Sequence, residues 1–174
     1  MAITRLNTNA FGTSVNLASN VTGTLPTANG GTGATSFSPG KVLQVVTVTD
    51  DTTRDTSASS YTQISSFDLA ITPSATSSKI FLSFSGLLYQ KSNTGTGFLT
   101  FYRDSTDLSG SAAGFAINDA DGYYDGSTGL SYLDSPNTTS QVTYKIYIKT
   151  GGSATVEIAN AGALGSFTAF EIGA

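Results

Sequence analysis

The sequence predicts an all-β head over residues 41–174, built as an antiparallel sandwich or barrel and preceded by an extended arm over residues 1–40. Three observations support this prediction. Apolar and polar residues alternate with a period of two in several short segments, as they do in strands with one buried face. Gly, Ser, Asn and Pro separate these segments, and no window shows a sustained helical period.

The clearest strand segments combine β-branched or aromatic residues with this alternation. They are KVLQVVTVT (41–49), YTQISSFDLAI (61–71), KIFLSFSGLLY (79–89), GFLTFYR (97–103), QVTYKIYIKT (141–150), ATVEI (154–158) and SFTAFEI (166–172). In the third, Phe84 shares a face with Ile80 and Leu82, whereas Phe81 faces the other way. In 141–150 the even-numbered residues are expected to point inward. In total we expect about eight to ten short strands.

Residues 1–40 differ in composition from the rest and are assigned to a docking arm with a Gly/Thr-rich linker. The linker GTLPTANGGTGAT (23–35) has no charge and one large apolar side chain, too little for a core of its own. The residues before it include five large apolar side chains, more than an ordinary solvated tail carries. They are Ile3, Leu6, Phe11, Val15 and Leu17. We expect them to dock on a partner protein; the alternative is a tail without a partner.

The whole chain is sparsely charged. Charged residues make up 11% of its 174 residues and hydrophobic ones 39%, whereas typical soluble domains are ~25% charged. A surface of this kind has few charged groups to desolvate when it packs against another surface, which favours long-lived assembly. The basic residues are scattered and the formal net charge is −4, so we expect no nucleic-acid partner.

The chain contains neither His nor Cys. Their absence excludes Ser–His–Asp and Cys–His catalysis, imidazole or thiolate metal sites, and disulfides. No apolar run approaches the ~20 residues that cross a bilayer, and the start MAITRLNTNAFGTS lacks the continuous apolar stretch of a secretory signal. We therefore expect no cofactor, no membrane insertion and no Sec-type export.

A hydrolase in this chain would have to work with carboxylates alone. Glu157 and Glu171 lie in predicted strands beside apolar residues, where burial raises a carboxyl pKa as a glycoside hydrolase requires. The simpler interpretation is that each points outward or pairs with a cation such as Lys145 or Lys149. The GGTG cluster at 30–33 lacks the Lys–Ser/Thr pair and the α/β context of a phosphate loop. We expect no enzyme.

The segment NDADGYYDG (118–126) groups acidic and aromatic residues in one loop. The residues concerned are Asp119, Asp121, Tyr123, Tyr124 and Asp125. A calcium loop is one interpretation, but the EF-hand pattern would then put Ile117 and Thr128 at ligand positions. An acidic surface loop with Asx turns is favoured, and no metal site is expected. The two tyrosines also suit recognition of a sugar or a partner pocket.

The C-terminal strand carries large apolar groups on both faces. Phe167 lies on one face, and Phe170 and Ile172 on the other. One face can enter the core of the monomer while the other packs against a symmetry mate, so we assign these three residues to a trimer interface. A central strand buried within a monomer explains them equally well.

Several segments resemble proteins of tailed bacteriophages. GTLPTANGGTGATSF is similar to the Gly/Thr linkers of tail fibres and related virion proteins. GKVLQVV, SFDLAITPSATSSKIFLSFSG, FYRDSTDL and TAFEIGA resemble a small jelly-roll head of phage appendages, similar in plan to the trimeric tumour-necrosis-factor-like fold. The resemblance implies a jelly-roll head, a homotrimer, an N-terminal arm that docks on the virion and an exposed distal face.

These features together lead to a functional expectation. The chain is expected to be a non-enzymatic structural protein of a phage virion, a homotrimeric knob on the virion surface held through residues 1–38 by a capsid or tail protein. Its shortness favours capsid decoration or a head fibre. The first alternative is a short tail-fibre tip that binds a glycan or protein on the host surface. The second is a domain that binds glycans or cleaves them with carboxylates.

Overall fold

The computed structural model describes residues 41–91, 95–120, 124–158 and 162–173, with the backbone alone over 116–120 and 124–125. The chain divides into two units, 1–39 and 40–174, and every described residue belongs to the second. The expected docking residues Ile3, Leu6, Phe11, Val15 and Leu17 lie outside the described residues.

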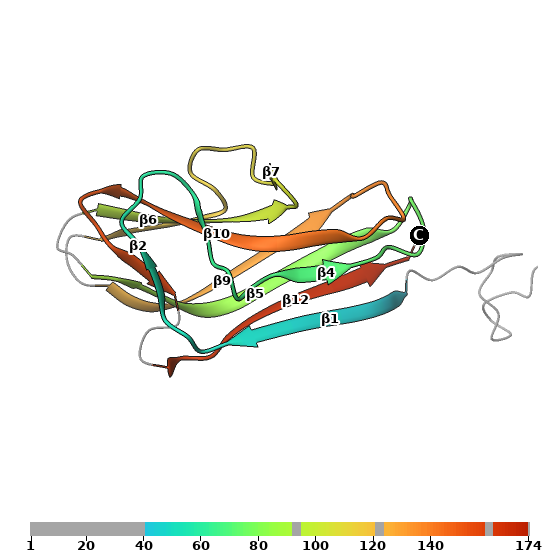
Figure 1. Ribbon diagram of the computed structural model, residues 1–174, viewed down its shortest axis with the longest axis horizontal. Coiled ribbons are helices and arrows are strands. Elements are labelled where there is room, and N and C mark those ends of the chain that lie inside the picture. Colours follow the sequence, from blue (N-terminus) through green and yellow to red (C-terminus); the bar gives the residue numbers. More distant parts are fainter. Residues whose placement is uncertain (1–40, 92–94, 121–123, 159–161, 174) are drawn as a thin grey trace, which may run out of the picture. The chain divides into compact units, whose positions relative to one another are not determined.

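The all-β prediction is confirmed. The described residues form twelve strands and no α-helix, and all of their strand pairs are antiparallel (Figure 1). In the same residues there is no helix of the length and apolarity that a membrane span requires.

Sheet A has four strand positions, and at two of these positions a pair of strands lies end to end. In order across the sheet they are β1 (Val42–Asp50) with β2 (Arg54–Thr56), β12 (Gly165–Ile172) with β11 (Val156–Ile158), β5 (Lys79–Gln90) and β9 (Tyr124–Asp134). β9 pairs along one edge of β5, while β12 and β11 share the other edge. Among the described residues, β9 and the line of β1 and β2 are thus the two edges of sheet A (Figure 1).

Sheet B is built in the same way. Its positions, in order, are β3 (Thr62–Gln63) with β4 (Leu69–Ile71), β10 (Val142–Gly152), β6 (Gly95–Arg103) and β7 (Thr106–Asp107) with β8 (Ala116–Ala120). β10 and β6 form the centre of the sheet, paired over nine residues. Along the chain, strand positions alternate between sheets A and B, apart from the step from β6 to β7, which stays in sheet B.

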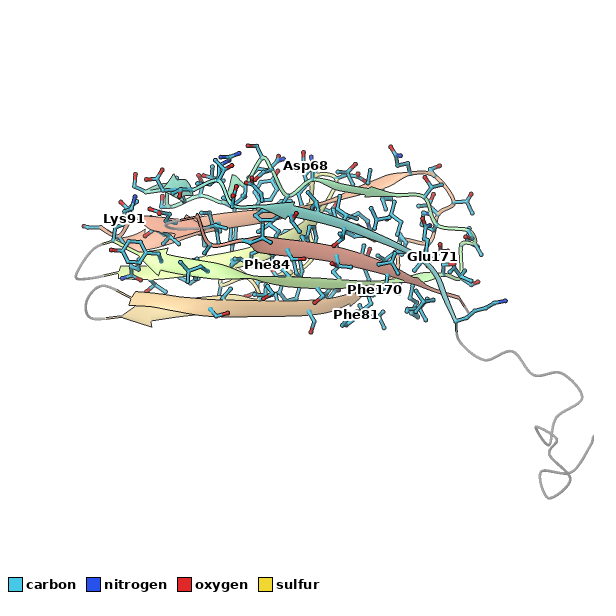
Figure 2. The ribbon with its side chains drawn as sticks, turned by 90° about the horizontal axis from the view of Figure 1, so that it is seen from below. Asp68, Phe81, Phe84, Lys91, Phe170 and Glu171 are labelled. Atoms are coloured by element: carbon cyan, nitrogen blue, oxygen red, sulfur yellow. The ribbon has the colours of Figure 1, made fainter. Side chains whose placement is uncertain are left out.

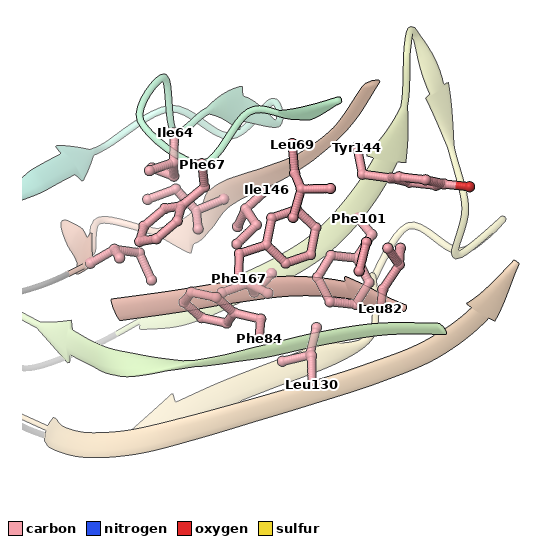
Figure 3. Packing of buried hydrophobic residues seen from close by; sticks show 14 of the residues in the cluster. Ile64, Phe67, Leu69, Leu82, Phe84, Phe101, Leu130, Tyr144, Ile146 and Phe167 are labelled. Atoms are coloured by element: carbon pink, nitrogen blue, oxygen red, sulfur yellow. The ribbon is translucent and has the colours of Figure 1, made fainter. Parts of the chain in front are cut away.

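The core lies between the two sheets and is rich in phenylalanine (Figure 3). Phe167 of β12 stacks on Phe101 of β6 with ring centroids 5.3 Å apart, and Phe84 of β5 meets Phe67 edge-on at 5.4 Å. The predicted faces are confirmed: Ile80, Leu82 and Phe84 are buried, and so are the even-numbered residues of β10 from 142 to 150. Rings from both sheets interdigitate, so neither sheet can bury its apolar face without the other.

The segment 61–71, predicted as one strand, forms two. A turn separates β3 from β4, in which the N–H of Phe67 donates to the carbonyl of Ile64 at 3.1 Å. The turn lets both Ile64 and Phe67 point into the core, which an unbroken strand would prevent because residues three apart face opposite sides.

Candidate functional site: the outer face of sheet A

A row of four large apolar side chains crosses the outer face of sheet A, one from each strand position. The row consists of Val45, Phe170, Phe81 and Leu133, each directly opposite the next in the strand register. The rings of Phe81 and Phe170 lie 6.1 Å apart (Figure 2). Val45, Phe81 and Leu133 are 54%, 37% and 50% exposed. We call these four residues the apolar row.

Beside the apolar row, the face consists of small, neutral residues. The next row holds Thr47, Thr168, Ser83 and Ser131, and the one after it Thr49, Ser166, Ser85 and Gly129. Thr47 and Thr168 hydrogen-bond to each other through their hydroxyls. None of these three rows contains a charge, so a flat, neutral surface extends over the middle of the sheet. Such a surface can be covered without desolvating an ion.

The apolar surface continues toward the start of β1. Val42 pairs with Ile172, and Val42 and Leu43 are exposed. Lys79 is opposite Ile172 on β5, and its Nζ donates to Ser135 Oγ at 2.8 Å. The apolar row is therefore the centre of a patch that reaches the end of the sheet, rather than a set of scattered exposed side chains.

The three residues assigned to a trimer interface do not share a face. Phe170 and Ile172 lie on the outer face of β12, as expected. Phe167 is fully buried in the core of its own chain, so its assignment to the interface is wrong. It shares the inward face with Ala169 and Glu171, because every second residue of a strand points to the same side.

Glu171 points into the sandwich, not outward as the simpler interpretation had it. Its Oε1 accepts from the backbone N–H of Ser74 at 2.6 Å, and its Oε2 accepts from Gln44 Nε2 at 2.7 Å and from Ser74 Oγ at 3.1 Å. Burial raises the pKa of this carboxyl, but these bonds and the nearby Ser78 hydroxyl outweigh burial and hold the pKa below its usual value. Glu171 is thus an ionised anchor for the turn between β4 and β5.

Glu157 lies on the outer side of sheet A but is covered, with 1% of its surface exposed. Its neighbours in the register are Asp55 and Tyr89. The cation beside it is Lys91, whose ammonium also approaches Asp55 at 3.4 Å, and not Lys145 or Lys149. The hydrogen bond to Glu157 raises the pKa of Lys91. The expected pairing with a cation is present, with a different lysine.

The two glutamates do not form a catalytic pair. Glu171 is opposite Ile80 and Glu157 is opposite Tyr89, nine residues further along β5. At ~3.3 Å per residue they are about 30 Å apart along the strand, and glycosidase carboxylates lie within ~10 Å of each other. Figure 2 places Glu171 and Lys91, the partner of Glu157, at opposite ends of the head.

A buried ionic network joins the two sheets near the Glu171 end. Arg103 Nη1 of β6 contacts both carboxylate oxygens of Asp134 on β9, at 2.9 and 2.7 Å. The hydroxyl of Tyr144 on β10 donates to Asp134 Oδ2 at 2.7 Å. Burial first, and then the bond to Asp134, raise the pKa of Tyr144 far above its usual value. Arg103 therefore pairs with Asp134 inside the sandwich, and the network has a structural role.

The remaining predicted site lies outside the part of the chain whose side chains are described. This applies to Asp119, Asp121, Tyr123, Tyr124 and Asp125. Within the described part there is no group of three acidic residues that could hold a metal ion, and no enclosed pocket. The sequence matches no family model and no curated protein.

Sequence reasoning missed three of the four residues of the apolar row. Val45, Phe81 and Leu133 lie far apart in the chain, and their alignment depends on the order of the strands. A signal was available for Phe81, because a large ring on the face opposite Phe84 has no place in the same core. For Leu133 there was none, since its strand was not predicted.

Proposed function

We propose that this chain is a non-enzymatic structural protein of a tailed-phage virion. Its head forms a homotrimer through the outer face of sheet A, and residues 1–38 dock on another virion protein. The observation that carries the proposal is the apolar row, which stands in register across all four strand positions of sheet A beside two uncharged rows. The same neutral face on the other copies of the chain in a trimer is a partner that this surface fits.

The energetics favour covering this face. Burying a large apolar side chain contributes ~1.5–3 kcal/mol relative to leaving it exposed. Phe170 is already partly covered by its neighbours, so Val45, Phe81 and Leu133 have the most to gain. In a closed threefold assembly each protomer buries its own row, so the gain is repeated three times against the cost of bringing three chains together.

The strand order supports a jelly-roll head. Eight strand positions in two four-position sheets, with the chain alternating between sheets, is the plan of that fold. Segments that carry the resemblance to phage heads also have structural roles in this chain: Ser74 of ITPSATSSKIFL holds Glu171 of TAFEIGA, and Arg103 of FYRDSTDL holds Asp134. The resemblance therefore rests on residues that build the head.

The carboxylates that a hydrolase would need are committed to other contacts. Glu171 is kept ionised by its donors, and a general acid must be protonated near neutral pH. Glu157 is covered and paired with Lys91. The hydrogen bonds of Glu171 and the ion pair of Glu157 support a structural protein over a glycan-cleaving one.

A deletion tests the docking part of the proposal. Chains that lack residues 1–38 are expected to remain soluble trimers and to be absent from purified phage particles, whereas full-length chains co-purify with the particles. Incorporation of the truncated chain at the wild-type level would contradict docking through this segment.

Adsorption assays distinguish the two virion locations: the full-length trimer, added in excess, blocks adsorption to host cells if it is a tail-fibre tip and has no effect if it decorates the capsid.

A further inference from the structure

The outer face of sheet B, away from the apolar row, carries a cluster of aromatic side chains. The cluster consists of Tyr61, Phe98, Tyr102 and Tyr147, all partly exposed. Tyr102 of β6 stacks on Tyr147 of β10 with ring centroids 3.9 Å apart, and Tyr61 meets Tyr102 at 6.3 Å. We call these four residues the aromatic platform. Sheet B thus has an aromatic outer surface, whereas the middle of sheet A is lined by small hydroxyls.

Two lysines lie within this platform. Lys149 places its ammonium 4.5 Å from the ring centre of Tyr61 and 4.9 Å from that of Phe98, and it donates to the carbonyl of Ala112. Lys145 stands opposite Tyr102 in the register of β10 and β6. Neither lysine forms an ion pair with a carboxylate of the described residues. Both lysines therefore place positive charge on this face.

The acidic residue opposite Tyr102 on the neighbouring strand forms several hydrogen bonds. Asp107 is opposite Tyr102, and its Oδ1 accepts hydrogen bonds from Thr100 Oγ1 at 2.8 Å and from the backbone and hydroxyl of Ser109 at 2.9 and 2.8 Å. Those bonds hold it at the edge of the sheet. The chain has a formal net charge of −4, and Lys145 and Lys149 stand on the same outer face of β10, four residues apart along the strand.

We propose that the aromatic platform binds an acidic glycan, a chain of sugars that bear carboxylates. Aromatic rings bind the apolar C–H faces of sugars, and tyrosine hydroxyls offer hydrogen bonds at the ring edges. Lys145 and Lys149 supply the complementary charge for carboxylates spaced along the glycan. The surface is open, so the ligand lies along the sheet as an extended chain. The site is separate from the self-association face, so its failure would leave the proposed trimer untouched.

The test uses the full-length chain and isothermal titration calorimetry. The acidic probes are oligogalacturonate, oligomannuronate, hyaluronan hexasaccharide and oligosialate, and maltohexaose and cellohexaose are the neutral controls. At least one acidic probe is expected to bind, and the neutral ones are expected to bind about tenfold more weakly or not at all, in line with the loss of one or two charge-assisted contacts. Absence of binding by all four acidic probes at millimolar concentration overturns the proposal.

Three variants locate the site. Lys145→Glu is expected to weaken binding at least tenfold, whereas Lys79→Glu, the same charge change beside Ile172 at the start of β5 in sheet A, leaves it unchanged. Tyr147→Ala removes a ring and is expected to weaken binding by a similar factor; its far-ultraviolet circular dichroism shows whether the sheet persists. Equal loss in both lysine variants, or no loss in Lys145→Glu, contradicts the assignment. Equal binding of polyglutamate would show a general polyanion surface and also overturn it.

Discussion

The backbone N–H of Ser74 donates a 2.6 Å hydrogen bond to Oε1 of Glu171, which ties the last strand to the turn that precedes β5. Gln44 of β1 donates to the other carboxylate oxygen and also to the carbonyl of Thr72. One buried charge therefore holds two strands and a turn together. A buried carboxylate persists only where such donors surround it.

Replacing Glu171 by Gln is expected to lower the free energy of unfolding by about 2–4 kcal/mol at pH 7, because charged hydrogen bonds are lost and an amide N–H₂ faces existing donors. Chemical denaturation measures the change. Asp68→Asn is the matched control, since Asp68 is exposed and accepts one bond from Gln63. It is expected to change stability by less than about 0.5 kcal/mol. Equal effects in the two variants would contradict the anchor role.

The same contact predicts an acid dependence. The pKa of Glu171 is lower in the folded chain than its ordinary value of 4.5. The unfolded state therefore binds the proton more readily, so the stabilisation is present above about pH 4.5 and is lost as the pH falls through the folded-state pKa. Denaturation midpoints between pH 7 and pH 3 are expected to fall more steeply for the wild type than for Glu171→Gln. Parallel curves would contradict the lowered pKa.

Removing one partner of the buried Asp134 network is expected to be costly. Arg103→Met leaves the carboxylate of Asp134 without its cation and should destabilise the head by about 3–5 kcal/mol. Tyr144→Phe removes one hydrogen bond and should cost about 1–2 kcal/mol. Thermal unfolding of the two variants shows which of them loses more stability. A larger loss in Tyr144→Phe than in Arg103→Met would contradict the assignment of the arginine as the main partner.

Two tyrosines predict an alkaline limit to stability. Burial, followed by the charge of Asp107, raises the pKa of Tyr61 to about 12, and the pKa of Tyr144 is also raised. An unfolded tyrosine releases its proton near pH 10, so this stabilisation is present below pH 10 and is lost as the pH rises toward the folded-state values. Tyrosinate absorbance is expected to rise near pH 10 and again toward pH 12. A single absorbance transition near pH 10, with the head still folded, would contradict the raised pKa values of these two tyrosines.

Strands with regular alternation were predictable from the sequence, and β9 was not. β5 and β10 showed their inward faces by alternation, whereas β12 carries phenylalanines on both faces and its inward face did not follow from the pattern. In β9 the inward face includes the buried Asp134, and its outward face includes Ser131 and Gly129, opposite Ser83 and Ser85 of β5. Its pattern therefore lacks the apolar signal, although it makes the longest pairing with β5.

The surroundings of Glu171 and Glu157 could not be predicted from the sequence either. Spacing places Glu171 on the same face as Phe167, but it does not show that Ser74 and Gln44, about a hundred residues upstream, provide donors there. Glu157 was correctly expected near a cation, and the choice of Lys91 follows from the pairing of β11 with β5. In both cases the pairing of strands far apart in the sequence determines the contact partners, and no local sequence pattern shows that pairing.

Replacing Phe170 by Asp places a charge in the middle of the apolar row. The variant is expected to be monomeric or insoluble, because a carboxylate would have to be desolvated at the interface. Ala70→Asp is the control, since Ala70 is exposed on β4 in sheet B. It is expected to remain trimeric. Size-exclusion chromatography with light scattering compares the two, and trimers from Phe170→Asp would place the interface on another surface.

The central claim is that the chain forms a homotrimer, and sedimentation equilibrium of the full-length wild-type chain tests it most directly. We predict a mass of three chains of 17.8 kDa, about 53 kDa, at micromolar concentration. A single species of 17.8 kDa over the same concentration range would contradict the claim.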